Sequence, residues 1–96
     1  MDISGVLVQV VPGRERDVVA AIREKAGVEV HEILSGGKVV LTIETDTPDD
    51  AHDIAAAIRR LPGVLSTDLA FHYFDGDQNG RLDPALVESF IENERG

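Results

Sequence analysis

The sequence of 96 residues predicts one α+β domain with the element order β-α-β-β-α-β, followed by a short C-terminal helix. Three observations support this order. Valine-rich runs too short for a helix alternate with segments in which apolar residues recur every three or four positions. Glycine-containing turns separate these segments. Residues 20–23 also recur as residues 56–59, and the pair at 27–28 recurs at 63–64, both at an offset of 36.

The first half of the chain is expected to supply three strands and one helix. A strand at 3–11 stops at a Pro-Gly pair, and a helix follows over 14–26, where apolar side chains share one face. Gly27 is expected to end that helix. Two strand-like runs at 28–34 and 38–45 surround a Ser-Gly-Gly turn, which is typical of a hairpin.

The second half begins with a strong helix start. Thr47 is a good capping residue, Pro48 suits the first helical position, and two acids follow. The apolar stripe continues to Leu61, and a last strand is expected over 64–74.

Two β-α-β units joined by a hairpin are typical of the ferredoxin-like split βαβ fold (βαββαβ). Right-handed crossovers then place both helices on one face of a four-stranded antiparallel sheet with strand order 4-1-3-2. We expect the domain to comprise residues 1–75, with a polar turn and the C-terminal helix (76–96) appended to it. The second face of the sheet is predicted to be open.

Composition narrows the classes of partner. With 18 acidic and 9 basic residues the net charge is −9, which disfavours nucleic acids and anionic membranes and favours a basic ligand or peptide. Cysteine is absent, so disulfides and thiolate metal sites are excluded. Residues 1–11 lack a basic start and are too short for a signal peptide or membrane span, so we expect a soluble cytoplasmic protein.

Strand alternation predicts which side chains reach the open face. In the last strand Leu65, Leu69 and Phe71 are expected to face the helices. The second strand is ambiguous by one residue, which indicates a bulge. The mixed composition of this face suits a binding surface and an ordinary solvated face equally well. The residues expected on the open face are Leu7, Gln9, Val40, Thr42, Glu44, Ser66, Asp68, Ala70 and His72.

Catalytic and metal-binding patterns are weak. His31 and His72 fall on the two outer strands, roughly 14 Å apart, which is too far to share a metal ion. His52 lies among acids in the first turn of a helix and is interpreted as a surface residue. Acylphosphatase chemistry on this fold needs an asparagine near the sheet, but the only asparagines are Asn79 and Asn93 in the C-terminal addition. We therefore expect no catalytic residue and no cofactor.

The sharpest local motif resembles the start of an EF-hand loop. Oxygen-bearing side chains occupy its first, third, fifth and ninth positions, but the twelfth, which should be glutamate, is Leu86. A polar turn and a weak calcium site both fit this pattern. The candidate ligands are Asp75, Asp77, Asn79 and Asp83.

A C-terminal helix is expected from Pro84 to about Glu94. It carries an apolar stripe that must be covered, either by the open face or by packing elsewhere. The stripe comprises Leu86, Val87, Phe90 and Ile91.

Five segments at 5–9, 27–31, 37–41, 61–66 and 69–74 together resemble, in order and spacing, the NapD family. The resemblance covers residues 3–75. It implies a cytoplasmic chaperone that binds the twin-arginine signal peptide of the catalytic subunit of periplasmic nitrate reductase and delays export until the cofactors are loaded. It also implies that the protein is not an enzyme and keeps no cofactor.

Acidic side chains near the sheet face are candidate partners for the paired arginines of such a peptide. They are Glu29, Glu44 and Asp68. Two alternatives stay open on the same fold: a regulatory module similar to ACT domains, which bind amino acids, and an oligomeric assembly subunit.

Overall fold

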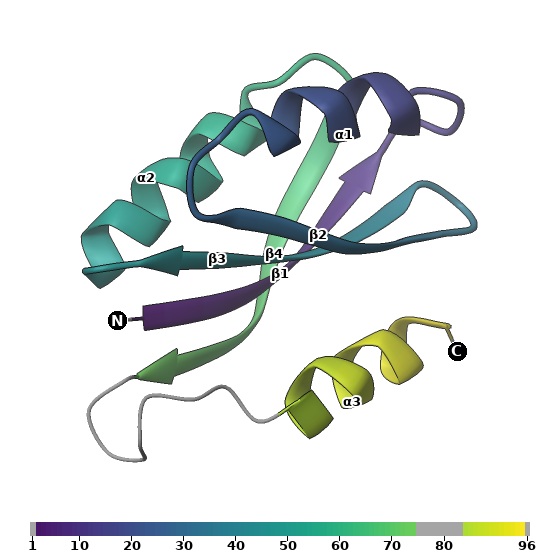
Figure 1. The fold of residues 1–96 in the computed structure, drawn as a ribbon. Coiled ribbons are helices and arrows are strands. Elements are labelled where there is room, and N and C mark those ends of the chain that lie inside the picture. Colours follow the sequence, from purple (N-terminus) through teal and green to yellow (C-terminus); the bar gives the residue numbers. More distant parts are fainter. Residues whose placement is uncertain (1, 75–83, 96) are drawn as a thin grey trace.

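The computed structural model describes residues 2–74 and 84–95 (Figure 1). The order of strands and helices is the one that the sequence predicts. The elements are β1 (Asp2–Val10), α1 (Glu15–Arg23), β2 (Val28–Leu34), β3 (Lys38–Thr45), α2 (Pro48–Arg59), β4 (Val64–Phe74) and α3 (Pro84–Arg95). The EF-hand-like turn falls outside the described residues.

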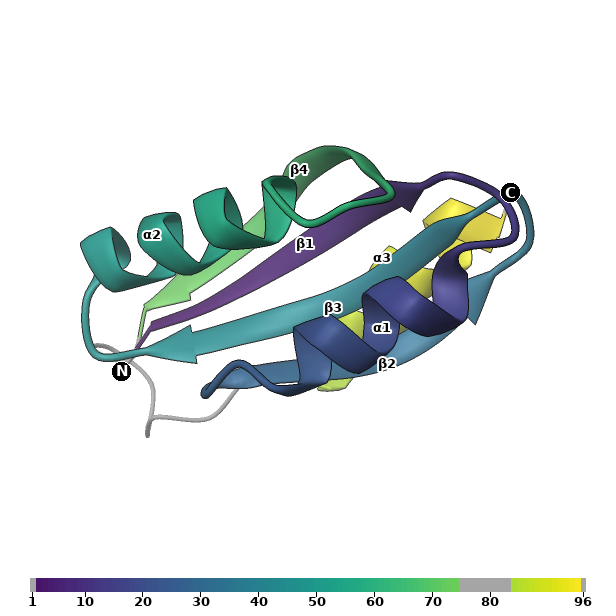
Figure 2. The same cartoon turned by 90° about the horizontal axis from the view of Figure 1, so that it is seen from above.

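The four strands form one antiparallel sheet in the order β2-β3-β1-β4, which is the predicted 4-1-3-2 order read from the other edge. Figures 1 and 2 show α1 and α2 together on one face of this sheet and α3 on the other. The predicted ferredoxin-like fold is therefore confirmed, and its second face carries the C-terminal helix.

The main core lies between the sheet and the pair α1 and α2. Alternate residues of the two central strands supply its floor, and the apolar stripes of the helices supply its roof. Burying each such side chain is worth about 1.5–3 kcal/mol. The fully or nearly fully buried members include Val6, Val8, Val10, Val18, Val19, Ile22, Val39, Leu41, Ile43 and Ile58.

The helix ends differ in how well the sequence predicts them. Thr47 caps α2 as expected, because its hydroxyl oxygen accepts a hydrogen bond of 3.2 Å from the Asp50 backbone N–H. The first helix ends at Arg23, earlier than predicted, because the next two N–H groups bond to carbonyls three residues back and tighten the last turn. Gly27 then turns the chain into β2 with a φ of +80°. No helix in the described ranges has the length and apolarity needed to cross a membrane.

A bulge in β2 confirms the ambiguity seen in the sequence. Val30 pairs with Leu41, but Glu32 pairs with Val40, so His31 is the extra residue. The bulge moves Glu32 onto the sheet face that carries α3, because Glu32 then lies directly across from Val40.

A second bulge, in β4, corrects the predicted orientation of two residues. Gly5 pairs with Phe71 and Val6 with Leu69, so Ala70 is the extra residue. Phe71 therefore lies on the face of α3, and His72, opposite Ser4, lies on the face of α1 and α2. Both assignments are the reverse of those expected from strict alternation, because one inserted residue exchanges the two faces beyond it.

The two leucines of β4 expected in the core are largely exposed, Leu65 at 59% and Leu69 at 65%. Leu65 falls at a further register shift, between the partners of Gln9 and Val10. Leu69 does face α2, but β4 is an edge strand, and three of the α2 residues that line the same pocket, Ala51, Ala55 and Ala56, have small side chains. Neither leucine is enclosed as the sequence predicts.

We predict that Gly5→Ala destabilises the protein through Phe71. A Cβ atom on Gly5 would lie within 2.6 Å of three ring carbons of Phe71, so the ring must move. We expect the free energy of unfolding in urea to fall by about 1–3 kcal/mol. In a Phe71→Leu background the same change should cost little, because the ring is gone. An equal loss in both backgrounds would contradict this account.

Candidate functional site

The candidate site is the open face, defined as the sheet face opposite α1 and α2. Its centre is a row of four cross-strand neighbours, one from each strand, which we call the central row. Val40 of β3 pairs with Leu7 of β1 on one side and with Glu32 of β2 on the other. Leu7 in turn pairs with Asp68 of β4. The row thus runs acid, leucine, valine, acid across the sheet, starting from Asp68.

The third helix lies on this row. Phe90 and Ile91 of α3 are each only 7% exposed, and they form a second buried cluster with Val40, which is fully buried. Leu7 and Leu34 pack against the same cluster. Figures 1 and 2 both place α3 along the side of the sheet that α1 and α2 leave uncovered.

An aromatic pair joins α3 to the edge strand β4. The rings of Phe71 and Phe90 are 5.8 Å apart between centroids and tilted by 52°. This geometry is favourable for aromatic rings. The pair forms only because the bulge at Ala70 turns Phe71 toward α3.

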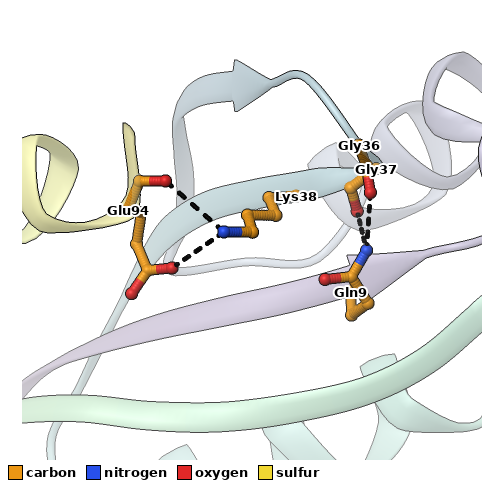
Figure 3. A network of polar contacts seen from close by, with 5 residues as sticks. All are labelled: Gln9, Gly36, Gly37, Lys38 and Glu94. Atoms are coloured by element: carbon orange, nitrogen blue, oxygen red, sulfur yellow. Dashed lines mark hydrogen bonds and ion pairs between the residues drawn. The ribbon is translucent and has the colours of Figure 1, made fainter. Parts of the chain in front are cut away.

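Polar contacts hold the C-terminal end of α3 to the start of the inner strand β3. The Lys38 Nζ atom donates to the Glu94 backbone oxygen at 3.4 Å and lies 3.6 Å from the Glu94 carboxylate (Figure 3). A cation at this position satisfies a carbonyl that the helix end leaves unpaired. Beside it, the Gln9 side-chain amide donates to the carbonyls of Gly36 and Gly37 and braces the hairpin turn.

The last arginine of α3 makes two ion pairs. Arg95 contacts the Glu32 carboxylate of the central row and the Glu92 carboxylate at 2.9 Å. The hydrogen bond that Arg95 donates to Glu32, with the charges of Glu32 and Glu92, raises the pKa of Arg95 above its ordinary value. Both Arg95 and Glu32 stay partly exposed, so water screens their interaction.

The strand register places seven of the nine predicted site residues on the open face. Val40 and Thr42 are buried there, while Glu44 and Asp68 are not. Ala70 is the extra residue of the β4 bulge and is exposed, and His72 points the other way. The seven residues are Leu7, Gln9, Val40, Thr42, Glu44, Ser66 and Asp68.

Residues of this face that sequence reasoning missed include Glu32, Leu34, Lys38 and Phe71. Glu32 and Phe71 follow bulges, which no local pattern locates to the residue. Lys38 opens β3 at the hairpin turn, and alternation with Val40 could have assigned it to this face.

The histidines do not form a metal site. His31, in the β2 bulge, hydrogen-bonds through Nε2 to the Thr42 hydroxyl at 2.9 Å and lies 3.7 Å from the Glu29 carboxylate. Over residues 2–74 and 84–95 no three His, Asp or Glu side chains gather closely enough to hold a metal ion.

On the opposite face, residues of α2, β4, β1 and β3 line an open pocket of about 540 Å³. His52, Arg59, Leu69 and His72 are among its lining residues. Its size is within the range of small-molecule sites. A ligand bound there would be separated by the sheet from the central row.

A family model matches most of the chain. The model of the family described as NapD protein matches residues 1–76. A search of curated proteins finds no match.

Solved structures share the fold. The solution structure of the E. coli Tat proofreading chaperone protein NapD superposes with a TM-score of 0.69 at 18% identity, covering 84% of this chain and 86% of that one. The hypothetical protein PHS023 from Pyrococcus horikoshii gives 0.68 at 19% identity, over 81% of this chain and 99% of that one. The protein TTHA0845 from Thermus thermophilus gives 0.66 at 26% identity, over 77% of this chain and 98% of that one.

Proposed function

The chain belongs to the NapD family, and from this premise we propose that it is a chaperone that binds a twin-arginine signal peptide. Its proposed client is the catalytic subunit of a periplasmic nitrate reductase, which it holds in the cytoplasm until the cofactors are loaded. The protein is proposed to act by binding alone, without catalysis and without a cofactor of its own.

The observation that carries this proposal is the amphipathic helix on the open face. Phe90 and Ile91 of α3 are buried on Val40, and Arg95 of the same helix pairs with Glu32. The face can therefore accept a helix that offers apolar side chains to its centre and a cation to its edge. A signal peptide has an apolar segment preceded by arginines, so it offers the same two features.

Charge supports the same partner. The chain carries a net charge of −9, and acidic side chains border the open face on β2, β3 and β4. Arginine binds carboxylates through two parallel hydrogen bonds, which makes it the preferred cation for such sites. The same charge leads us to propose that the protein binds neither nucleic acid nor an anionic membrane directly. The bordering acids are Glu29, Glu32, Glu44 and Asp68.

We predict that a synthetic twin-arginine signal peptide binds with a dissociation constant in the low micromolar range or tighter. Replacing both arginines with glutamine should weaken binding at least about tenfold, because two charge-assisted contacts are lost. Raising the salt from about 0.1 M to about 1 M shortens the Debye length from about 10 Å to about 3 Å and should weaken only the arginine peptide strongly. Isothermal titration calorimetry measures all four combinations. Equal affinity for the two peptides would remove the arginines from recognition.

We predict that Leu7→Asp lowers the affinity for this peptide by at least about tenfold. The new carboxylate would stand unpaired between Val40 and Asp68, in the apolar centre of the row. Ile33→Asp is the matched control, because Ile33 is 47% exposed and lies on the sheet face of α1 and α2. It should bind the peptide as the wild type does. Normal binding by a folded Leu7→Asp protein, checked by its melting temperature, would place the site elsewhere.

A further inference from the structure

The helix on the open face lies beyond the part of the chain that defines the family. The family model ends at residue 76, while α3 spans Pro84–Arg95. This chain therefore brings its own amphipathic helix to the surface that we propose for the client. Two helices cannot pack on Leu7, Leu34 and Val40 at once, so α3 and the client exclude each other.

The central row shows how the two ligands correspond. Glu32 and Asp68 stand at its two ends, about 14 Å apart across three strand spacings, with Leu7 and Val40 between them. Arg95 of α3 contacts Glu32 at one end of the row. Phe90 and Ile91 of the same helix pack on the apolar residues between the two acids. Asp68, at the other end, is not buried.

We infer that α3 occupies the surface of the open face to which the client binds. Arg95 pairs with the Glu32 carboxylate, which receives one arginine of the client when the client is bound. Asp68 receives the other arginine. This inference rests on the proposed function and adds to it the residues that recognise the arginine pair. Adjacent arginines with long side chains can diverge to the two ends of the row, while the apolar segment that follows them covers its centre.

The contacts of α3 suit an occupant that a client can displace. Two side chains, Phe90 and Ile91, are its buried anchors among residues 88–95. Both of its ion pairs with the sheet are partly exposed to water: the Arg95 and Glu32 side chains are 47% and 30% exposed, and those of Lys38 and Glu94 are 36% and 26% exposed. A client with two arginines offers the row one charged contact more than α3 does. The apparent affinity for the client is then the intrinsic affinity multiplied by the fraction of molecules in which α3 does not cover the face.

The first test undocks α3 in the full-length protein. Phe90→Asp with Ile91→Asp places two charges in the buried contact, whereas Ser89→Asp with Asn93→Asp adds the same charge at exposed positions of the same helix. We expect the first double variant to bind the twin-arginine peptide about tenfold tighter than wild type, and the control to bind within about twofold of it. Arg95→Gln, which removes only the ion pairs of Arg95, should raise the affinity about two- to threefold.

The second test locates the arginine acceptors in the undocked background. In that background Glu32→Gln and Asp68→Asn should each lower the affinity for the twin-arginine peptide about tenfold and leave the affinity for the diglutamine peptide unchanged. In the otherwise wild-type chain Glu32→Gln should have a smaller effect, because it also releases Arg95 and so frees the face. Glu24→Gln, an exposed acid after α1, is the control and should change neither peptide.

A structural readout accompanies both tests. The Phe71 ring contacts Phe90 when α3 is docked, so its NMR signals should shift when the peptide is added to wild type and should already be shifted in the undocked variant. Affinity unchanged by undocking, with shifted Phe71 signals and a folded protein, would overturn the inference and leave the proposed function standing. If the undocked variant fails to fold, an unchanged affinity of Arg95→Gln overturns it in the same way. No binding of the peptide by wild type or by any variant would overturn the proposed function itself.

Discussion

A four-stranded sheet has two faces, and the connections between its strands can cover only one of them. Right-handed crossovers put α1 and α2 on the same side, where they bury the valines of β1 and β3. The other side of the same strands carries Leu7 and Val40, which are also apolar. The open face therefore needs a further apolar partner, which explains the position of α3 and underlies the recognition and the competition that we propose.

In the central row, whether a residue is apolar or acidic depends on the position of its strand in the sheet. In the central row the apolar residues, Leu7 and Val40, come from the central strands β1 and β3, while the acids Glu32 and Asp68 come from the outer strands. An acid at the edge keeps part of its hydration, so it costs little when unoccupied and still attracts an arginine. The result is an apolar strip with charged ends, the usual arrangement of a protein-binding surface with a dry centre and a polar rim.

Much of this arrangement could be predicted from residues close together in the chain. The repeat at residues 20–23 and 56–59 indicated two β-α-β units, and the Thr47-Pro48 start located α2. Alternation assigned Leu7, Val40 and Asp68 to the open face, and the register agrees. Phe71 and His72 were assigned to the wrong faces because the extra residue at Ala70 is defined by pairing with β1, which lies near the other end of the chain.

The sequence alone determined the fold class and the acidic character of the open face, because periodicity, turn residues and composition are local or additive properties, and the resemblance of five segments indicated the family. Only the tertiary structure decided that Glu32 ends the central row, that Phe71 meets Phe90, and that α3 lies on the row with Arg95 on Glu32. Each of these depends on contacts between residues of different elements, and the first two depend on which residue of one strand stands opposite which residue of another. A bulge changes that pairing by one position and so exchanges the faces, and the docking of α3 joins Phe90 to Val40 and Arg95 to Glu32, residues separated by half the chain or more.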